Sequence, residues 1–257
     1  MRQPFGQNFL IDESIACKIV DSADIRPGET VIEIGPGKGI LTALIAQKAD
    51  KVIAIELDRN LASSLAGKMS LRKNVGVVSR DFLQYELPAG TAPVKFISNL
   101  PYAAATPIIE KFLPWPDWIE AIVMVQKEVG ERIAAGPGGR DYGVLSILTQ
   151  YFAKPELLFT VCPDSFYPHP KVNSIVLRLT NLHPEPPLPG LFAVIKSAFQ
   201  QRRKTVLNSI SSALNLPKND LEKLLVSAKI DPKLRPENLS LNQFIDLTKQ
   251  LKNDIIA

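Results

Sequence analysis

Short apolar segments alternate with helical patterns through the first half of this chain, and this alternation limits the possible fold more than any other feature. The segments are almost uniformly apolar, which is typical of strands that are buried on both faces. Strands that alternate with helices along a chain form a parallel sheet with helices on both sides. The sequence therefore predicts an α/β fold whose strands are Thr30–Ile34, Lys51–Glu56, Val75–Ser79, Val94 to about Asn99, and Ile119–Val125.

The second half of the chain changes character twice. Leu157–Val161 and Val172–Leu179 have the pattern of two late strands that could form a hairpin, and a proline-rich segment follows them. Prolines make such a segment a semi-rigid linker. Beyond it the pattern is helical. We therefore expect a first domain over residues 1–182, a linker over residues 183–190 and an all-helical C-terminal domain over residues 191–257.

The composition is that of an ordinary globular protein, with 46% hydrophobic and 22% charged residues. Lys and Arg outnumber Asp and Glu by 30 to 26, a balance that is compatible with nucleic acid without demonstrating it. No apolar run approaches the ~20 residues of a membrane span, and the first residues lack the pattern of a signal peptide. We therefore expect a cytoplasmic protein.

The cysteines and histidines do not have the spacing of a metal site. Cys17 and Cys162 are far apart, and the histidines are His169 and His183. No familiar zinc pattern can be assembled from them. We therefore expect no metal, and we expect both thiols to be packing residues in a reducing compartment.

A glycine-rich loop, Gly35–Gly39, follows the first predicted strand. It lacks the dinucleotide-binding spacing because position 40 is isoleucine, and it is not a P-loop because Lys38 is followed by glycine. A nicotinamide-dependent oxidoreductase is therefore disfavoured. Glycines at this place let the backbone turn tightly and approach a ligand closely.

Polar residues mark the ends of the next three strands. Glu56 ends the second strand, Asp81 follows the third and Asn99 ends the fourth. Ligands of open parallel sheets bind beyond the carboxyl ends of the strands, so these side chains should converge with Gly35 on one rim. Glu56 suits a ribose diol and Asp81 an exocyclic amine, although Glu56 could instead cap a helix and Asp81 could close a turn. A nucleoside site without a phosphate-binding motif indicates S-adenosyl-L-methionine.

A rigid turn, Asn99–Leu100–Pro101–Tyr102, ends the fourth strand. Pro101 cannot donate a ladder hydrogen bond, and it biases Leu100 away from helix, so the Leu100 carbonyl should point into a loop. The amide and the carbonyls could hold the edge of a planar base while the ring stacks on its face. The alternative is an ordinary turn at a strand end with a buried tyrosine.

Several motifs, taken in chain order, resemble those of the ribosomal RNA adenine dimethyltransferase family. They are Phe5–Leu10, Glu33–Gly39, Glu56–Asp58, Asn99–Tyr102, Gln126–Glu128, Phe166–Val172 and Gln201–Lys204. The most similar branch is the bacterial enzyme that dimethylates two adjacent adenines near the 3′ end of small-subunit (16S) rRNA during ribosome biogenesis. The resemblance implies a Rossmann-like methyltransferase domain with a mostly parallel seven-stranded sheet, and a small helical C-terminal domain that binds RNA. It also implies S-adenosyl-L-methionine as methyl donor, S-adenosyl-L-homocysteine as product, the immature 30S subunit as partner, and a monomer without a metal.

The resemblance assigns a cofactor site by motif position. The residues that would close over the cofactor or lie beneath it are Gln7, Asn8, Leu10, Gly35 and Gly37. Glu56 would hold the ribose hydroxyls, and Asp81 would hold the cofactor adenine. Asn99 would face both the cofactor and the target base.

We expect the target adenine to be extruded from its RNA stack and held by the turn that Pro101 stiffens. Asn99 Oδ1 and the Leu100 carbonyl would accept the N–H groups of the exocyclic nitrogen. Tyr102 would stack on one face of the base and Phe166 on the other. The candidate RNA contacts are Arg202, Arg203 and Lys204 at a helix start, with Arg140 and Lys171 near the mouth of the pocket.

Two other functions remain compatible with the sequence. One is a large-subunit rRNA adenine methyltransferase of the macrolide-resistance type. The other is a non-catalytic ribosome-assembly or nucleic-acid-binding factor on the same fold.

Overall fold

The computed structural model describes residues 8–87, 93–183 and 186–255. Among these residues, contacts divide the chain into a first unit, up to Gly130 together with Ala153–Asn181, and a second unit, Glu131–Phe152 together with the chain from Leu182. The predicted boundaries are therefore wrong for residues 131–152. These residues group with the C-terminal helices because Tyr142 and Ile147 lie in the helical core.

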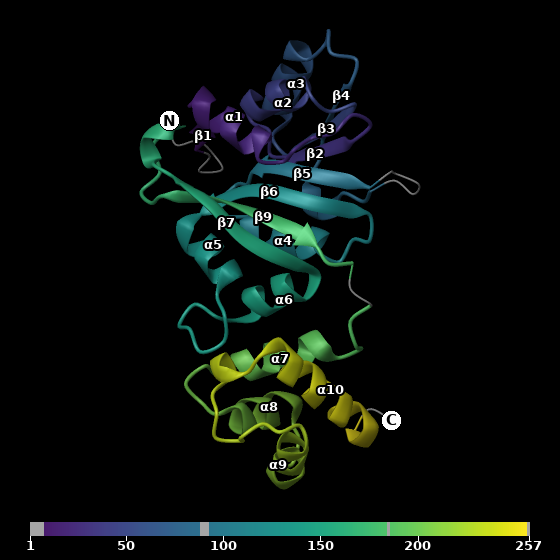
Figure 1. The fold of residues 1–257 in the computed structure, drawn as a ribbon, viewed down its shortest axis with the longest axis vertical. Coiled ribbons are helices and arrows are strands. Elements are labelled where there is room, and N and C mark those ends of the chain that lie inside the picture. Colours follow the sequence, from purple (N-terminus) through teal and green to yellow (C-terminus); the bar gives the residue numbers. More distant parts are fainter. Residues whose placement is uncertain (1–7, 88–92, 184–185, 256–257) are drawn as a thin grey trace. The chain divides into compact units, whose positions relative to one another are not determined.

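The first unit is built on a mixed sheet (Figure 1). Within the described residues it has seven strands in the order β4-β3-β2-β5-β6-β9-β7. Neighbours from β4 to β6 pair in parallel, and β9 pairs antiparallel with both β6 and β7. The strands are β2 (Thr30–Ile34), β3 (Lys51–Glu56), β4 (Val75–Ser79), β5 (Val94–Asn99), β6 (Trp118–Gln126), β7 (Ala153–Val161) and β9 (Ser174–Asn181). The predicted α/β fold and the antiparallel pairing of the two late strands are confirmed.

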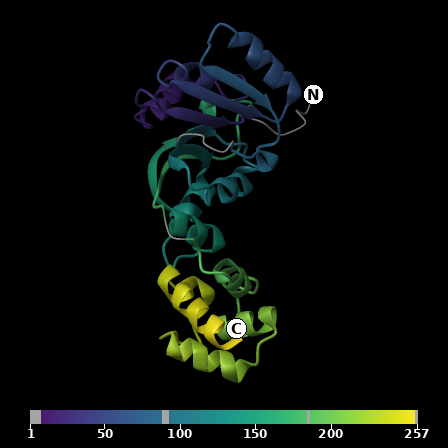
Figure 2. The same ribbon diagram turned by 90° about the vertical axis from the view of Figure 1, so that its right-hand side faces the viewer.

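Helices cover both faces of this sheet, as Figures 1 and 2 show. On one face, α1 and α2 pack in a common core with Val31 and Ile97 of the sheet. On the other face, Phe112 of α4 stacks on Phe96 of β5, with 4.5 Å between the ring centroids. The helical segments are α1 (Glu13–Asp21), α2 (Ile40–Ile45), α3 (Arg59–Lys68), the short 3₁₀ turn η1 (Phe82–Gln84), α4 (Ala105–Phe112) and α5 (Lys127–Ala134), which crosses into the second unit at Gly130.

A small antiparallel ladder joins the start of the described chain to the proline-rich loop between β7 and β9. It pairs β1 (Phe9–Leu10) with β8 (Phe166–Tyr167), so that Phe9 lies opposite Tyr167 and Leu10 opposite Phe166. The 3₁₀ turn η2 (Pro163–Ser165) leads into β8. The N-terminal segment is therefore held on the first unit beside the ends of the parallel strands.

The second unit packs its helices around a core that includes Leu191, Ile210 and Phe244. Its elements are α6 (Val144–Phe152), α7 (Leu191–Phe199), α8 (Val206–Leu214), α9 (Lys218–Ser227), the 3₁₀ turn η3 (Pro236–Asn238) and α10 (Leu241–Ile255). Helix α8 begins after Thr205, whose side chain accepts a hydrogen bond from the backbone N–H of Asn208. The basic residues 202–204 therefore lie in the turn before α8.

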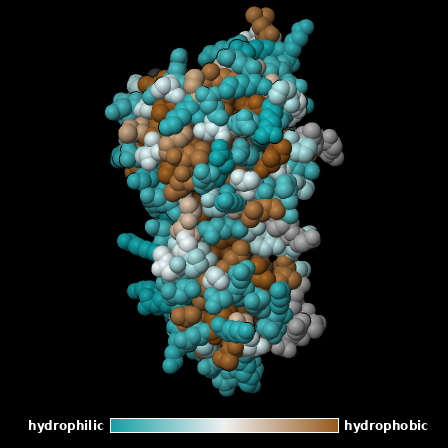
Figure 3. All heavy atoms as spheres, in the orientation of Figure 1, coloured by the Kyte–Doolittle hydropathy of each residue, from teal (hydrophilic) through white to brown (hydrophobic). Residues whose placement is uncertain are grey.

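No helix in the described part of the chain is long and apolar enough to cross a membrane. Figure 3 shows hydrophobic and hydrophilic side chains interspersed over the face that it draws. The expectation that the thiols are packing residues is wrong, because Cys17 and Cys162 are both exposed. Each lies in a segment whose apolar neighbours, and not the cysteine itself, face the core.

Candidate active site

A cavity of about 200 Å³ lies at the carboxyl ends of the parallel strands. Glu56, Asp81 and Asn99 all line it, together with the glycine loop. The expected convergence on one rim is therefore present in the fold. The predicted site residues that line the cavity are Asn8, Leu10, Gly35, Gly37, Glu56, Asp81, Asn99, Leu100, Pro101 and Tyr102. Gln7 lies outside the described residues.

The glycine loop and the Asn-Leu-Pro-Tyr turn pack directly against each other. Gly35 has a φ of +67°, and a Cβ at this position would lie 3.2 Å from the Pro101 ring. Gly37 has a φ of +56°, and a Cβ there would lie 3.0 Å from the Phe9 ring. Both glycines are thus required by a left-handed backbone and by a close neighbour. The two motifs form one structural unit.

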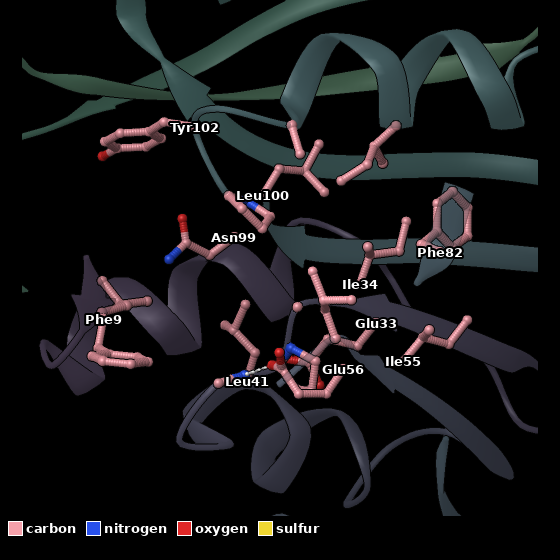
Figure 4. Close-up of a pocket in the computed structure, with 18 of the residues that line it drawn as sticks. Phe9, Glu33, Ile34, Leu41, Ile55, Glu56, Phe82, Asn99, Leu100 and Tyr102 are labelled. Carbon is pink, nitrogen blue, oxygen red and sulfur yellow. Dashed lines mark hydrogen bonds between the residues drawn. The ribbon is translucent and has the colours of Figure 1, made fainter. Parts of the chain in front are cut away.

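Glu56 organises the loop through its carboxylate. Its Oε2 accepts a hydrogen bond from the Gly37 N–H at 3.0 Å (Figure 4). Its Oε1 accepts a hydrogen bond from the Asp58 N–H at 3.0 Å. The side chain is only 2% exposed. Since a carboxylate has about four acceptor positions, each oxygen keeps capacity for a further donor. The structural and the ribose-binding interpretations of Glu56 are therefore compatible.

Asp81 also combines two features. Its Oδ1 accepts a hydrogen bond from the Leu83 N–H at 2.9 Å and so caps η1. The residue lines the cavity next to Phe82. The turn-closing role that the sequence allowed is present, and it fixes the carboxylate at the rim.

Glu33 is a site residue that the sequence reasoning missed. It lines the cavity and is 1% exposed. The pKa of its carboxyl is raised to about 8, mainly because burial disfavours the charged form, and the nearby Glu56 carboxylate acts in the same direction. A hydrogen bond that Thr42 Oγ1 donates at 2.5 Å lowers the pKa and only partly offsets the rise. The available signal was an acidic residue inside an apolar strand, two positions before the glycine loop. At neutral pH this carboxyl is mostly protonated in the absence of a ligand. A cation bound beside it would favour the ionised form.

The Asn99 amide is only partly paired. Its Nδ2 donates to the Asn8 carbonyl at 3.4 Å, whereas its buried Oδ1 has no hydrogen-bond partner among the described residues. The adjacent Leu100 N–H donates to the Met124 carbonyl at 3.0 Å, which fixes the backbone of the turn. A buried acceptor without a donor is costly, and here it lines a cavity. The geometry is that of an acceptor prepared for an N–H group of a ligand.

Tyr102 is held by its hydroxyl group. The hydroxyl lies 2.5 Å from Oγ of Ser174, which is fully buried at the start of β9. Burial raises the pKa of the Tyr102 phenol above its usual range. In the view of Figure 4, the Asn99 amide lies between the Tyr102 ring on one side and Phe9 on the other. The ring and the unpaired acceptor thus line the same cavity.

Phe166 requires a correction. Its side chain is 0% exposed and packs in the core with Leu10 and Val176, so its ring offers no face to a substrate. The physical reason is the alternation of side chains along β8, which turns Phe166 inward and Tyr167 outward. Phe9, which the sequence reasoning did not assign, lines the cavity instead.

The predicted RNA contacts fall into two groups. Lys171 is exposed in the first unit and does not line the cavity. Arg140, Arg202, Arg203 and Lys204 are exposed in the second unit, where the Arg202 guanidinium donates to the Arg140 carbonyl at 2.7 Å. Arg140 does not line the cavity, and within the second unit it lies beside Arg202.

Among the described residues, no group of three or more His, Cys, Asp or Glu side chains could hold a metal ion. The amide and charged side chains that line the cavity are the amides of Asn8 and Asn99, the carboxyls of Glu33, Glu56 and Asp81, and the cations Lys38 and Arg80. The amides and carboxyls suit a nucleoside and an amino-acid moiety. Together with the doubly wound sheet, this site defines an S-adenosylmethionine-dependent methyltransferase.

The chain belongs to the ribosomal RNA adenine dimethylase family, whose model matches residues 1–253. It is 47% identical to ribosomal RNA small subunit methyltransferase A of Alkaliphilus metalliredigens (strain QYMF), over 96% of this chain and 90% of that protein. It is 40% identical to the protein of the same name from Moorella thermoacetica, over 98% of this chain and 93% of the relative. The family resemblance inferred from the motifs is thus confirmed.

Two solved structures are similar over nearly the whole chain. A dimethyladenosine transferase from Plasmodium falciparum has a TM-score of 0.78 and 25% identity, covering 95% of this chain and 98% of its own. The 23S rRNA methyltransferase ErmE has a TM-score of 0.72 and 27% identity, covering 95% of this chain and 100% of its own. The predicted fold class is confirmed by these similarities.

Proposed function

We propose that this chain transfers methyl groups from S-adenosyl-L-methionine to N6 of two adjacent adenines near the 3′ end of small-subunit rRNA. The observation that carries the proposal is the unpaired, buried Oδ1 of Asn99 in the cavity that Gly35 and Glu56 share. The relatives at 40% and 47% identity are named for the small subunit, which supports that substrate.

The exocyclic nitrogen of adenine is a poor nucleophile because its lone pair is delocalised into the ring. Asn99 Oδ1 and the Leu100 carbonyl would each accept one of its N–H groups. These hydrogen bonds favour a tetrahedral nitrogen whose lone pair is localised toward the methyl donor. Since a duplex base cannot reach such a site, the adenine must be single-stranded or extruded.

The residues around the cavity fit the cofactor. Glu56 would accept from the ribose hydroxyls, and Asp81 from the adenine amine. Glu33 would ionise toward the methionine ammonium group, because a neighbouring cation favours the charged carboxylate. When bound, the cofactor supplies a methyl group on a sulfonium, which is a good leaving group.

Catalysis by these residues is therefore mostly alignment. Tyr102 would stack on the target base, an interaction worth ~1–3 kcal/mol, while its hydroxyl stays anchored on Ser174. The nitrogen held by Asn99 and Leu100 would take the methyl group, a neutral thioether would leave from the sulfonium, and the proton that the nitrogen loses would pass to water. A second transfer to the same nitrogen requires room for the first methyl group.

RNA binding is assigned to exposed basic groups. Arg140, Arg202, Arg203 and Lys204 form one exposed cluster of the second unit, and Lys171 is an exposed cation of the first. Such contacts to phosphates position an RNA without reading its sequence. We assign the immature small subunit as the partner, the cytoplasm as the location, and a monomer as the working state.

Large-subunit rRNA is the second candidate substrate, because ErmE shares the fold over 95% of this chain. The identity to ErmE is 27%, against 47% to the small-subunit relative. A non-catalytic assembly role is less well supported, since a scaffold would have no need for the unpaired acceptor of Asn99.

The test is to incubate the protein with labelled methyl donor and either unmethylated small subunits or large-subunit RNA, and to map the modified bases. We expect N6,N6-dimethyladenosine at two adjacent positions of the small-subunit RNA. Label in large-subunit RNA alone would assign the other substrate. Absence of label in both RNAs, with the cofactor bound, would overturn the enzymatic function.

A further inference from the structure

Tyr167 is an exposed aromatic residue that the proposed catalytic machinery does not use. Its side chain is 62% exposed, although it follows directly on the fully buried Phe166. Exposed apolar residues scattered over a surface are normal, so exposure alone carries no meaning. The position of Tyr167 relative to the cavity is what distinguishes it.

The β1–β8 ladder places Tyr167 next to Phe9. The two residues are directly opposite in register, so their side chains leave the ladder on the same side. Opposite residues have Cβ atoms about 4.5–5.5 Å apart. Leu10 and Phe166, the other pair, are buried on the opposite side.

Phe9 connects this pair to the site. It lines the cavity, and its ring lies so near Gly37 that a Cβ there would be 3.0 Å from it. Lys38 Nζ lies 4.9 Å from the centroid of the Phe9 ring, and the Lys38 side chain is exposed. Tyr167 itself is not part of the cavity lining, but the ladder pairs it with Phe9, a lining residue that also has Lys38 above its ring.

We infer that Tyr167 binds the substrate RNA by stacking on the nucleotide next to the adenine in the pocket. This inference rests on the proposed function, in which two adenines are adjacent. Extruding one of them removes a stacking partner from its neighbour, and an exposed phenol ring can replace that partner. Lys38 supplies a positive charge for the phosphate between the two nucleotides. The site then holds a dinucleotide, with Asn99 and Tyr102 on the reacting base and Tyr167 on the other.

Steady-state kinetics on unmethylated small subunits give the first test. Tyr167→Ala should lower kcat/KM about 10- to 100-fold, mainly by raising KM, whereas Tyr167→Phe and Tyr167→Trp should restore most of it. Cofactor affinity and the melting temperature should not change, because the ring is mostly exposed. Leu71→Ala is the matched control, since Leu71 is a 94% exposed apolar residue outside the cavity lining.

The second test identifies the base. Small subunits are reconstituted with an abasic site at each position that flanks a target adenine in turn. At one of these positions the wild-type rate should fall and Tyr167→Ala should cause no further loss. Full additivity at both positions, or a Tyr167→Ala rate equal to wild type, would overturn the inference while leaving the proposed function intact. Failure of the wild-type protein to methylate intact small subunits would overturn both.

Discussion

Two buried polar groups at opposite ends of strand β5 differ in whether they have hydrogen-bond partners. Near the start of β5, Lys95 Nζ donates to the carbonyls of Ala23 and Asp24 at 2.8 and 2.9 Å. It also lies 3.0 Å from Glu29 Oε2, so its three donors each have an acceptor. At the end of the same strand, Asn99 Oδ1 has no partner among the described residues.

The difference separates stability from function. The contacts of Lys95 are complete, whereas the unpaired Asn99 Oδ1 costs free energy and also lines a cavity, which together indicate a place for a ligand. Glu33 follows the same rule at the functional end, because burial without a cation raises its pKa to about 8. Substitutions near the start of β5 should therefore mainly lower stability, whereas substitutions at its end should mainly lower methyl-transfer activity.

The largest expected effect is on the pH dependence of stability at Glu33. The folded carboxyl titrates at about 8 and the ordinary value is 4.5, so the folded state keeps a proton that the unfolded chain loses. Stability should therefore fall as pH rises from 4.5 to 8, by a few kcal/mol in total, on the order of 1 kcal/mol for each pH unit. Glu33→Gln, which has the shape of the protonated acid, should flatten this dependence. Urea unfolding of the cofactor-free proteins at several pH values measures it, and parallel curves for the two proteins would contradict the assignment.

Asn99→Ala should show the opposite signature, a loss of activity without a loss of stability. Removing an acceptor that meets the reacting group should lower the single-turnover rate by about 10²–10³-fold. The free energy of unfolding should change little, because the variant loses the long hydrogen bond to Asn8 but also removes an unpaired buried acceptor. Quench-flow kinetics and urea unfolding give the two numbers. A variant with a near-normal rate would show that the amide does not contact the target nitrogen.

Lys95→Met should complete the contrast at the other end of the strand. We expect a loss of about 3 kcal/mol in the free energy of unfolding, because two carbonyls lose their donor and Glu29 keeps, within the described part of the chain, only the Arg26 N–H as partner. The folded fraction should keep its methyl-transfer rate. Lys51→Met is the matched control, since Lys51 is an exposed lysine at the start of β3. Equal stabilities of the two variants would mean that the Lys95 contacts contribute nothing net.

The sequence was sufficient to predict the rim of the sheet but not the opposite end. The rim follows from topology, since the carboxyl ends of parallel strands must meet, and so the order of strands and helices along the chain was enough to group Glu56, Asp81 and Asn99. Lys95 is a single lysine in an apolar strand, and its three partners are more than 60 residues away in sequence. No local pattern encodes such contacts.

Two further features depend on tertiary packing for a similar reason. The facing of Phe166 and Tyr167 depends on the register of a two-residue strand, and a shift of one residue would exchange them. The assignment of residues 131–152 to the second unit depends on Tyr142 and Ile147, which pack in one core with residues of α7, α8 and α10. In both cases the local sequence pattern is the same for either packing arrangement, so the pattern alone cannot predict which one forms.

A smaller effect should separate the ring of Tyr102 from its hydroxyl. Tyr102→Ala should lower kcat/KM, because lost stacking raises the free energy of the transition state by ~1–3 kcal/mol. Tyr102→Phe keeps the ring but leaves Ser174 Oγ buried without its partner, so it should mainly cost stability, by about 1 kcal/mol. Pairing Tyr102→Phe with Ser174→Ala should recover that stability. Equal activity losses in the Ala and Phe variants would argue against stacking.

The smallest effect is expected where charges are exposed and neither end of the sheet is touched. Arg203→Gln should weaken RNA binding uniformly and reduce the slope of log K against log salt by about 1, because one phosphate contact is lost. The single-turnover rate at saturating RNA should not change, since Arg203 lies in the second unit and outside the cavity lining. Lys218→Gln, an exposed lysine at the start of α9, is the matched control and should leave the slope unaltered. If both variants have the same slope, Arg203 does not contact a phosphate. The RNA-binding surface would then have to be sought among other basic residues, including those near the cavity.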